Sequence, residues 1–340
     1  MQIDYRSDTV TKPGSAMKKA MTEALLGDDV FGEDPTVNKL QVKMAKMFGF
    51  EDGLFCPSGT MTNQIAIKCH TSPGDEVICD ENSHVYQYEG GGIAFNSGCS
   101  VRLLQGNLGR LNATLIENAV NNNNDIHKAI SSLVSLENTS NRGGGACYDF
   151  STFNTIKKVC DKNALKLHLD GARIFNAIIA NNENAKAYGK IFDSISVCLS
   201  KGLGAPVGSV LLGNKKFIEK ARRFRKVFGG GMRQAGMLAA AGIYALDHHI
   251  KRLATDHHHA KAIAEILQTK NFVGTILPVE TNIIIFEVMS KFKNAHEFIE
   301  LLRRKNILAI PMSKTQIRMV THLDITEKMV QKTINEIEKI

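Results

Sequence analysis

Hydrophobic positions along the chain change repeatedly between helical and strand-like spacing. In residues 36–48 apolar side chains recur at every third or fourth position, and Gly49 can end the stretch, so the spacing predicts a helix. A short apolar run at residues 53–56 then breaks at residues 57–60, before a second helical stretch at residues 61–70. This order of strand, tight turn and helix directs the first backbone amides of the helix outward.

The same alternation continues through the middle of the chain. Apolar runs that we predict to be strands lie at residues 76–80, 132–137, 166–170 and 194–199, separated by polar or helical segments such as residues 149–163. Because these runs are almost continuously apolar, helices should cover both faces of the sheet. The pattern predicts an α/β fold with a large, mostly parallel sheet and right-handed crossovers.

The last third of the chain has its own pattern. After three glycines at residues 229–231, residues 232–253 predict a long helix and residues 256–269 a charged one. Further strands are predicted at residues 281–286 and 316–320, and further helices at residues 295–304 and 326–340. We therefore expect a large domain at residues 15–250 and a small C-terminal α/β domain at residues 251–340.

Composition narrows the function classes. The 340 residues are 43% hydrophobic and 22% charged, so the chain can bury a sizeable core. The formal net charge is +8, but the only basic cluster is residues 215–226, aromatic residues are 6%, and tryptophan is absent. These values argue against nucleic-acid binding, which usually combines a basic face with stacking aromatics.

Cysteines and apolar runs bear on the compartment. The seven cysteines are never closer than ten residues, which favours free thiols in a reducing compartment over disulfides or a metal knuckle. Residues 1–19 contain no apolar signal core, and the longest apolar stretch, residues 237–246, is too short to span a bilayer. We expect a cytoplasmic protein without a membrane partner.

Three groups at predicted strand ends and turns could carry chemistry. Ser58, Gly59 and Thr60 begin a helix, where free amides and the helix dipole suit an anion, although the same residue types are ordinary helix caps. Asp170 ends one strand and Lys201 follows another, at the edge where open α/β sheets bind ligands. Taken alone, the aspartate could cap a turn and the lysine could be solvated.

In combination these groups indicate one cofactor. Pyridoxal 5′-phosphate needs an anion cradle, a carboxylate for its ring nitrogen and an amine for its aldehyde. A carboxylate beside the pyridine nitrogen favours the protonated ring, which accepts electrons. No metal is expected at the histidines of residues 257–259, because consecutive side chains on a helix point in different directions.

Six blocks in order give the chain a family resemblance. It resembles the low-specificity L-threonine aldolases of the beta-eliminating lyase and threonine aldolase family, which have the aspartate aminotransferase-like fold type I of pyridoxal-phosphate enzymes. The matching blocks are residues 6–13, 27–36, 136–139, 168–173, 199–204 and 229–234. The resemblance covers essentially the whole chain.

The resemblance implies a role for each candidate residue. Lys201 would bind pyridoxal phosphate covalently, Asp170 would meet its ring nitrogen, and His84 would stack on the ring and act as the base. Other positions would hold the phosphate (Ser58, Gly59, Thr60), the substrate carboxylate (Ser7, Arg173, Arg318, with Arg173 also near the cofactor) and a neighbouring subunit's phosphate (Lys226, Arg233). Residues 1–14 would thus contribute to the active site, and a shared site implies a homo-oligomer, either a dimer or a tetramer.

The implied reaction is the cleavage of L-threonine and L-allo-threonine into glycine and acetaldehyde, which serves threonine breakdown and glycine supply. Ser140 and Phe31 depart from the family pattern, in which many relatives have a histidine and a tyrosine, and both bear on the preference at Cβ. Because fold and cofactor do not fix which bond breaks, β-elimination and aldol cleavage of another β-hydroxy-α-amino acid stay open. A catalytically silent binding protein is the alternative outside the enzymes.

Overall fold

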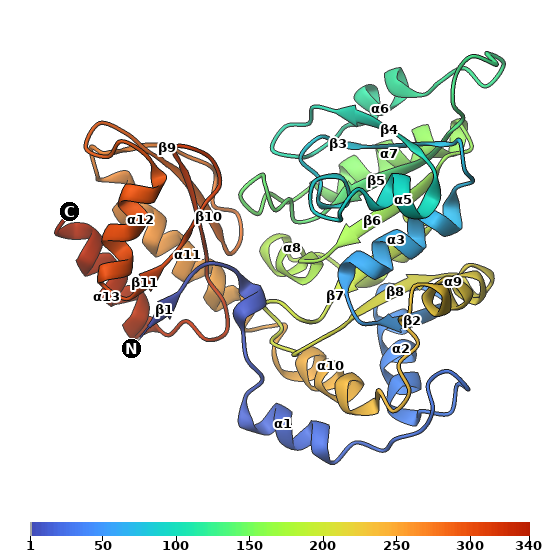
Figure 1. Cartoon of the computed structure of the whole chain (residues 1–340), viewed down its shortest axis with the longest axis horizontal. Helices are drawn as coiled ribbons and strands as arrows, with labels where there is room; N and C mark the ends of the chain where they lie inside the picture. Colours follow the sequence, from blue (N-terminus) through green and yellow to red (C-terminus); the bar gives the residue numbers. More distant parts are fainter. Residues whose placement is uncertain (1) are drawn as a thin grey trace.

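A seven-stranded sheet forms the centre of the larger of two lobes in the computed structural model, which describes residues 2–340 (Figure 1). Its order is β2 (Asp52–Cys56), β8 (Ser209–Gly213), β7 (Ser194–Cys198), β6 (Lys166–Gly171), β5 (Ser131–Glu137), β3 (Glu76–Asp80) and β4 (Ser100–Leu104). β8 runs in the opposite direction to the other strands of this sheet. The predicted large, mostly parallel sheet is confirmed.

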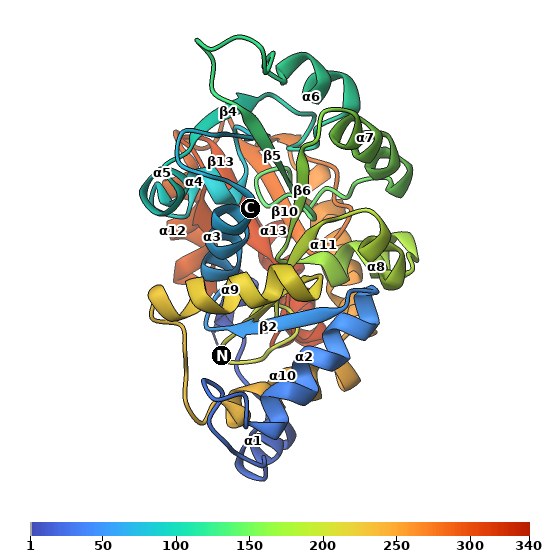
Figure 2. The ribbon, with the colours of Figure 1, turned by 90° about the vertical axis from the view of Figure 1, so that its right-hand side faces the viewer.

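Helices cover both faces of this sheet, which explains the continuous apolar character of its strands. Leu54 and Cys56 of β2 belong to one hydrophobic cluster and Phe55 to another, because successive side chains point to opposite faces. One face carries α3 (Gly59–His70), α5 (Gly92–Ser97) and α9 (Lys215–Val227); the other carries α2 (Pro35–Phe48), α6 (Ala113–Ala119), α7 (Phe150–Lys162), α8 (Ile174–Asn181) and α10 (Gly236–His248). Figure 2 shows α9 lying in front of the sheet beside β2.

The smaller lobe has a separate core and an antiparallel sheet. Its strands are β12 (Ile310–Pro311), β13 (Gln316–Val320), β10 (Ile283–Val288) and β9 (Val273–Ile276), with α11 (Leu253–Gln268), α12 (Ala295–Arg304) and α13 (Glu327–Glu338) packed against them. The expected small α/β unit is therefore observed. The exact boundary between the two domains, placed at residue 250, stays a prediction.

Residues 2–22 contact both lobes. Strand β1 (Ile3–Asp4) pairs in parallel with β11 (Ile307–Leu308), and Ile3 and Tyr5 are buried in the core of the smaller lobe. The chain then passes through the short helix η1 (Asp8–Val10) to α1 (Ser15–Thr22), which packs on α10 of the larger lobe (Figure 1). This segment therefore lies across the junction of the lobes.

Two sequence predictions differ from the structure. The long helix expected at residues 232–253 is shorter. The carbonyl of Arg233 accepts from the amide of Asp29, which is outside the helix, and after His248 the chain turns before α11 begins at Leu253. The basic run that we noted only for its charge is helix α9, and β4 and β8 were not predicted at all.

The remaining elements are short. They are α4 (His84–Gln87) and η2 (Ala185–Lys190). Among residues 2–340, no helix combines the length and the apolar character needed to cross a membrane.

One buried cap ties the start of α2 to two other segments. Asp34 accepts from the amides of Thr36 and Val37 at 3.0 Å each, and its other oxygen accepts from Gly236 at 2.9 Å and Gly27 at 3.2 Å. We expect Asp34→Ala to lower the free energy of unfolding by about 3 kcal/mol, since it removes a cap and leaves buried amides unpaired.

Asp149→Ala is the matched control, because Asp149 caps α7 at the surface with a bond to Ser151. It should lose about 1 kcal/mol. Urea denaturation of the two variants measures the difference, and equal losses would contradict the role given to Asp34.

Candidate active site

A cavity of about 390 Å³ opens at the sheet edge where β5 and β6 end. Its walls come from three parts of the chain: Ser7 and Thr9 from the first segment, Glu137 and Lys201 from the larger lobe, and Arg318 from the smaller lobe. This is the position at which open α/β sheets bind ligands.

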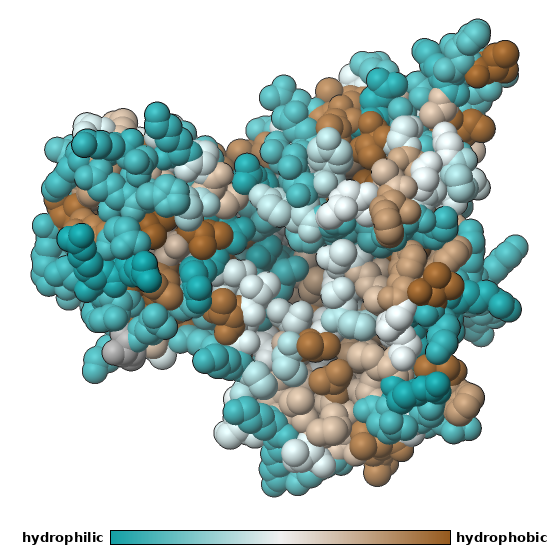
Figure 3. Space-filling view, viewed as in Figure 1, coloured by the Kyte–Doolittle hydropathy of each residue, from teal (hydrophilic) through white to brown (hydrophobic). Residues whose placement is uncertain are grey.

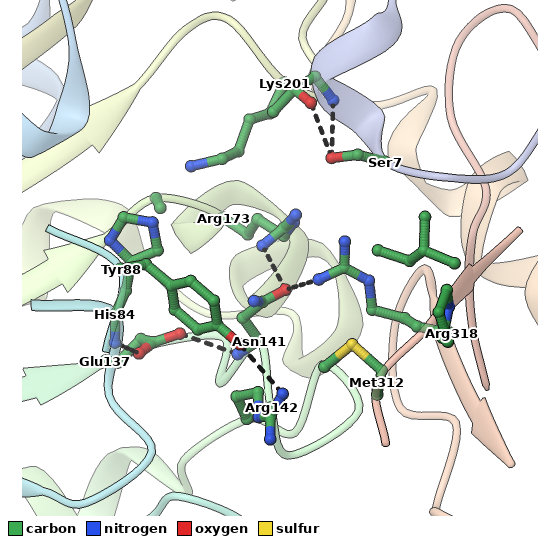
Figure 4. A pocket seen from close by; sticks show the side chains of 14 residues that line it. Ser7, His84, Tyr88, Glu137, Asn141, Arg142, Arg173, Lys201, Met312 and Arg318 are labelled. Carbon is green, nitrogen blue, oxygen red and sulfur yellow. Dashed lines mark hydrogen bonds between the residues drawn. The ribbon is translucent and has the colours of Figure 1, made fainter. Parts of the chain in front are cut away.

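The cavity brings together five of the predicted site residues. Lys201, His84, Ser7, Arg173 and Arg318 all line it (Figure 4). The amine of Lys201 lies across the cavity from the group formed by Arg173 and Arg318. The other predicted residues lie outside its lining and are described below.

The start of α3 lies close to Lys201. Lys201 Nζ is 3.4 Å from Cys198 Sγ, and a Cβ added at Gly59 would lie only 2.6 Å from the same sulfur. Only glycine therefore allows the helix to begin here. Ser58 Oγ accepts from the amide of Met61, whereas the first amides, those of Gly59 and Thr60, have no acceptor within the helix. They can bind an anion such as a phosphate.

Asp170 lies behind the cavity beside His84 and Glu89. Its carboxylate is buried and accepts from the amide of Ala172 at 3.1 Å and from Asn63 Nδ2 at 2.9 Å. One potential metal-ligand atom from each of His84, Glu89 and Asp170 lies within 4.8 Å of the other two. The arrangement suits a cationic ring nitrogen. As a metal site it is poor, since neutral amide groups already donate to both carboxylates.

Two glutamates hold His84 in place. Its Nδ1 is 2.9 Å from Glu89 Oε1, and its backbone amide donates to Glu137 Oε2 at 2.7 Å. Burial lowers the pKa of His84, but the hydrogen bond to Glu89 and the charge of Asp170 outweigh it and leave this pKa above its ordinary value. Since Nδ1 is engaged, Nε2 is the ring nitrogen that is left for a group in the cavity.

Glu137 is a site residue for which the sequence suggested no role. It ends β5, accepts from the amides of His84 and Asn141, and lines the cavity. Burial, with the nearby charge of Asp170, raises the pKa of Glu137 well above its ordinary range. The sequence signal that could have identified Glu137 is its position at the end of a predicted strand, as for Asp170.

Asp8 is a second residue that sequence reasoning missed. Arg173 Nε donates to Asp8 Oδ2 at 2.7 Å and Arg173 Nη2 to Asp8 Oδ1 at 2.8 Å, with both side chains buried. Burial opposes ionisation of Asp8, but the charge and hydrogen bonds of Arg173 outweigh it and lower the pKa of Asp8 to about 2. The third guanidinium nitrogen, Arg173 Nη1, donates to Asn141 Oδ1 at 3.4 Å, so every guanidinium nitrogen of Arg173 already has one partner.

Arg318 retains unused donor capacity. Its Nη1 donates to Asn141 Oδ1 at 2.8 Å and its Nη2 to the carbonyl of Arg6 at 3.1 Å, while its buried Nε has no hydrogen-bond partner in residues 2–340. Burial, followed by the charge of Arg173, lowers the pKa of Arg318 to about 10. A carboxylate in the cavity would satisfy this cation.

Lys226 and Arg233 lie away from this cavity. Lys226 lines a separate cavity of about 790 Å³ beside Phe31 and Arg222. Arg233 Nη1 is 2.9 Å from Asp28 Oδ2, and its guanidinium lies over the exposed ring of Phe31. Within one chain, neither residue reaches the cavity that contains Lys201.

Ser140 does not face the cavity. Its side chain is buried, and its Oγ accepts from the amide of Gly143 at 3.2 Å. The following residues, Asn141 and Arg142, line the cavity instead, and Arg142 Nη1 donates to Tyr88 Oη at 3.0 Å (Figure 4). These contacts depend on a loop conformation that no periodicity in the sequence reveals.

Comparison with known proteins gives a consistent result. Residues 4–291 match the model of a family described as beta-eliminating lyase. The chain is 41% identical to low-specificity L-threonine aldolase 1 of Arabidopsis thaliana, over 98% of this chain and 94% of that protein. It is 40% identical to the low specificity L-threonine aldolase of Escherichia coli strain K12, over 96% of both. The solved structure of a Leishmania major threonine aldolase is similar in fold, with a TM-score of 0.86 at 20% identity over 99% of each chain.

The Asp8–Arg173 pair predicts a pH-dependent stability. Because the folded-state pKa of Asp8 is depressed, its contribution is complete above about pH 4 and is lost as pH falls towards about pH 2. We expect Asp8→Asn to lower the free energy of unfolding by about 3 to 5 kcal/mol near neutral pH, since it leaves Arg173 buried and unpaired. The difference from the wild type should shrink across that acid range.

Asp4→Asn provides the control, because Asp4 pairs with the half-exposed Arg6. It should cost at most about 1 kcal/mol. Denaturant titrations at neutral and acid pH measure both variants. A constant difference between Asp8→Asn and wild type at every pH would contradict the assignment.

Proposed function

The chain belongs to the beta-eliminating lyase family, and on that basis we propose that it is a carbon–carbon lyase that cleaves L-threonine and L-allo-threonine into glycine and acetaldehyde with pyridoxal 5′-phosphate as cofactor. The observation that carries the proposal is the convergence of an amine, a buried carboxylate and the open start of a helix around one cavity. The reaction would serve threonine breakdown and glycine supply.

The residues at this end of the sheet fit the proposed cofactor. Lys201 would bind its aldehyde covalently, Asp170 would face its ring nitrogen, and Ser58, Gly59 and Thr60 would hold its phosphate. When bound, pyridoxal phosphate withdraws electrons from the substrate Cα as the bond to Cβ breaks. Close packing of Gly59 against Cys198 supports this assignment, since a side chain there would move the helix amides away from Lys201.

Substrate orientation selects which bond at Cα breaks. We propose that Arg318 is the main ligand of the substrate carboxylate, since this arginine lines the cavity and no carboxylate of residues 2–340 forms a salt bridge with it. Ser7 and Arg173 would assist, since both line the cavity. Arg173 would use the N–H groups that Asp8 and Asn141 do not occupy. Gripping the carboxylate at one end fixes the rotation of the substrate about Cα.

His84 is the proposed base. With Nδ1 bonded to Glu89, Nε2 can accept the proton of the substrate β-hydroxyl, directly or through one water. Ser140 cannot take this part, because its hydroxyl is bonded to Gly143 and lies outside the cavity lining. Ser140 therefore supplies no second base near Cβ, which supports low discrimination between threonine and allo-threonine.

A dimer or tetramer with shared active sites is the proposed assembly. Pale and brown residues gather in Figure 3 over the part of the molecule where Figure 1 draws α1 and α10. Leu25, Phe31 and Met237 are exposed hydrophobic side chains of the segments near these helices. A second copy on this side would bring Lys226 and Arg233 to its neighbour's phosphate. All seven cysteines are free and buried, which supports a cytoplasmic location.

Product analysis tests the reaction. Incubation with L-threonine should yield glycine and acetaldehyde, whereas a 2-oxo acid and ammonia would indicate β-elimination. Lys201→Ala should lose both the turnover and the visible absorption band of protein-bound pyridoxal phosphate. Lys158→Ala, an exposed lysine of α7, should retain both. Persistence of the band in Lys201→Ala would overturn the assignment of that lysine.

Kinetics test the carboxylate site. We expect Arg318→Ala to raise the KM for threonine by about 10- to 100-fold, the range for losing charge-assisted hydrogen bonds, while the protein still binds the cofactor. Arg303→Ala, which removes an exposed arginine of α12, should leave KM unchanged. An unchanged KM in Arg318→Ala would mean that another group holds the carboxylate.

A further inference from the structure

A buried line of side chains connects Asp170 to the far end of α3. Asn63 Nδ2 donates to Asp170 Oδ2 at 2.9 Å, and Asn63 Oδ1 lies 3.1 Å from His168 Nε2. His168 Nδ1 is 2.8 Å from Ser194 Oγ, which is 2.8 Å from His70 Nε2. Asn63, His168 and Ser194 are almost completely buried, so these contacts are not exchanged for water.

The regular elements place these groups in line. Asn63 and His70 are two helical turns apart on α3 and therefore share a face. His168 and Asp170 alternate with Leu169 on β6, so both point to that helix, and Ser194 is the cross-strand neighbour of His168 on β7. The line belongs to the framework of the sheet and not to a loop.

The orientation of the Asn63 amide is fixed by its neighbours. Its nitrogen lies 2.9 Å from Asp170 Oδ2 and 2.8 Å from Glu89 Oε1, and both are acceptors. Turning the amide over would place its oxygen against two carboxylate oxygens. The two N–H groups therefore face the carboxylates, and Asn63 Oδ1 must accept from the other side.

The state of each remaining group follows from this orientation. Only a proton on Nε2 allows His168 to donate to Asn63 Oδ1, so in the neutral ring Nδ1 accepts from Ser194 Oγ. The Ser194 oxygen then accepts from His70 Nε2–H. Burial lowers the pKa of His168 to about 4 and that of His70 to about 3, in agreement with two neutral rings. All four donors then point towards Asp170.

We propose that His168, Ser194 and His70 are positioning residues, which act through one directed chain of hydrogen bonds to hold both N–H groups of Asn63 on Asp170 and Glu89. The amide thereby fixes two parts of the site together, since Glu89 also holds His84. The effect of this hydrogen-bond chain on cofactor binding rests on the proposed function. The protonation pattern itself depends only on the folded chain.

The first test is the tautomer of each histidine in the full-length protein without added cofactor. In protein labelled with ¹⁵N-histidine, long-range proton–nitrogen correlation spectra near neutral pH should show His168 and His70 as neutral rings protonated at Nε2. Signals are assigned by their loss in His168→Gln and His70→Gln. A proton on Nδ1 of His168, or a doubly protonated His168, would overturn the proposal.

The second test is the binding of pyridoxal phosphate by His168 variants, measured by absorption titration. His168→Leu removes the donor and should weaken binding about tenfold, as expected when one buried hydrogen bond is lost. His168→Gln keeps an N–H that can reach Asn63 and should stay within about threefold of wild type. His258→Gln, a change at an exposed histidine of α11, is the control for histidine replacement.

Two results would count against the proposed role of the hydrogen-bond chain. Equal weakening in His168→Leu and His168→Gln would point to packing and not to a hydrogen bond, and wild-type affinity in folded His168→Leu would show that the chain does not act on the site. Wild-type protein that binds no pyridoxal phosphate would end the proposed function instead. In that case the histidine spectra still test whether the hydrogen-bond chain has the proposed protonation pattern.

Discussion

Burial of four carboxylates around one cavity is the constraint on which the rest of the structure depends. They are Asp8, Glu89, Glu137 and Asp170. A buried carboxylate without a partner costs several kcal/mol, about as much as the net stability of a small domain. Each one here is held by donors from another segment, such as Arg173 for Asp8 and the side-chain amides of Asn63 and Gln64 for Glu89. The segments must therefore assemble together, and the site forms as they do.

The sequence predicts the parts of the site that follow from sheet geometry. Asp170 lies at the end of β6 and Lys201 follows β7, and the carboxyl ends of parallel strands lie at one edge, so the placement of both residues at that edge follows from the strands. The free backbone amides at the N-terminus of α3 follow from the turn at residues 57–60. The large sheet could also be predicted from its apolar runs. The antiparallel strand β8 could not, because its direction depends on the loop before it.

Other features depend on tertiary packing and leave no periodic signal. Arg318 enters the cavity from the smaller lobe, and the engagement of Arg173 by Asp8 depends on where the first segment crosses the junction. Asn63 is a polar residue in a helix, and its partners become clear only when the buried face of that helix is known. The start of α10 likewise depends on a distant bond, that of the Arg233 carbonyl with the Asp29 amide, so hydrophobic spacing overestimated the length of this helix.

The pairing of β1 with β11 makes the smaller lobe an unsuitable unit for separate expression. Ile3 and Tyr5 complete its core, Tyr5 Oη bonds Thr333 Oγ1 at 3.0 Å, and His322 Nε2 bonds the carbonyl of Asp4 at 2.7 Å. A fragment that starts after α10 would expose the apolar surface these residues cover. Recombination with a relative should therefore exchange the first ten residues and the C-terminal part as one block, since they share a single interior although more than two hundred positions separate them in the chain.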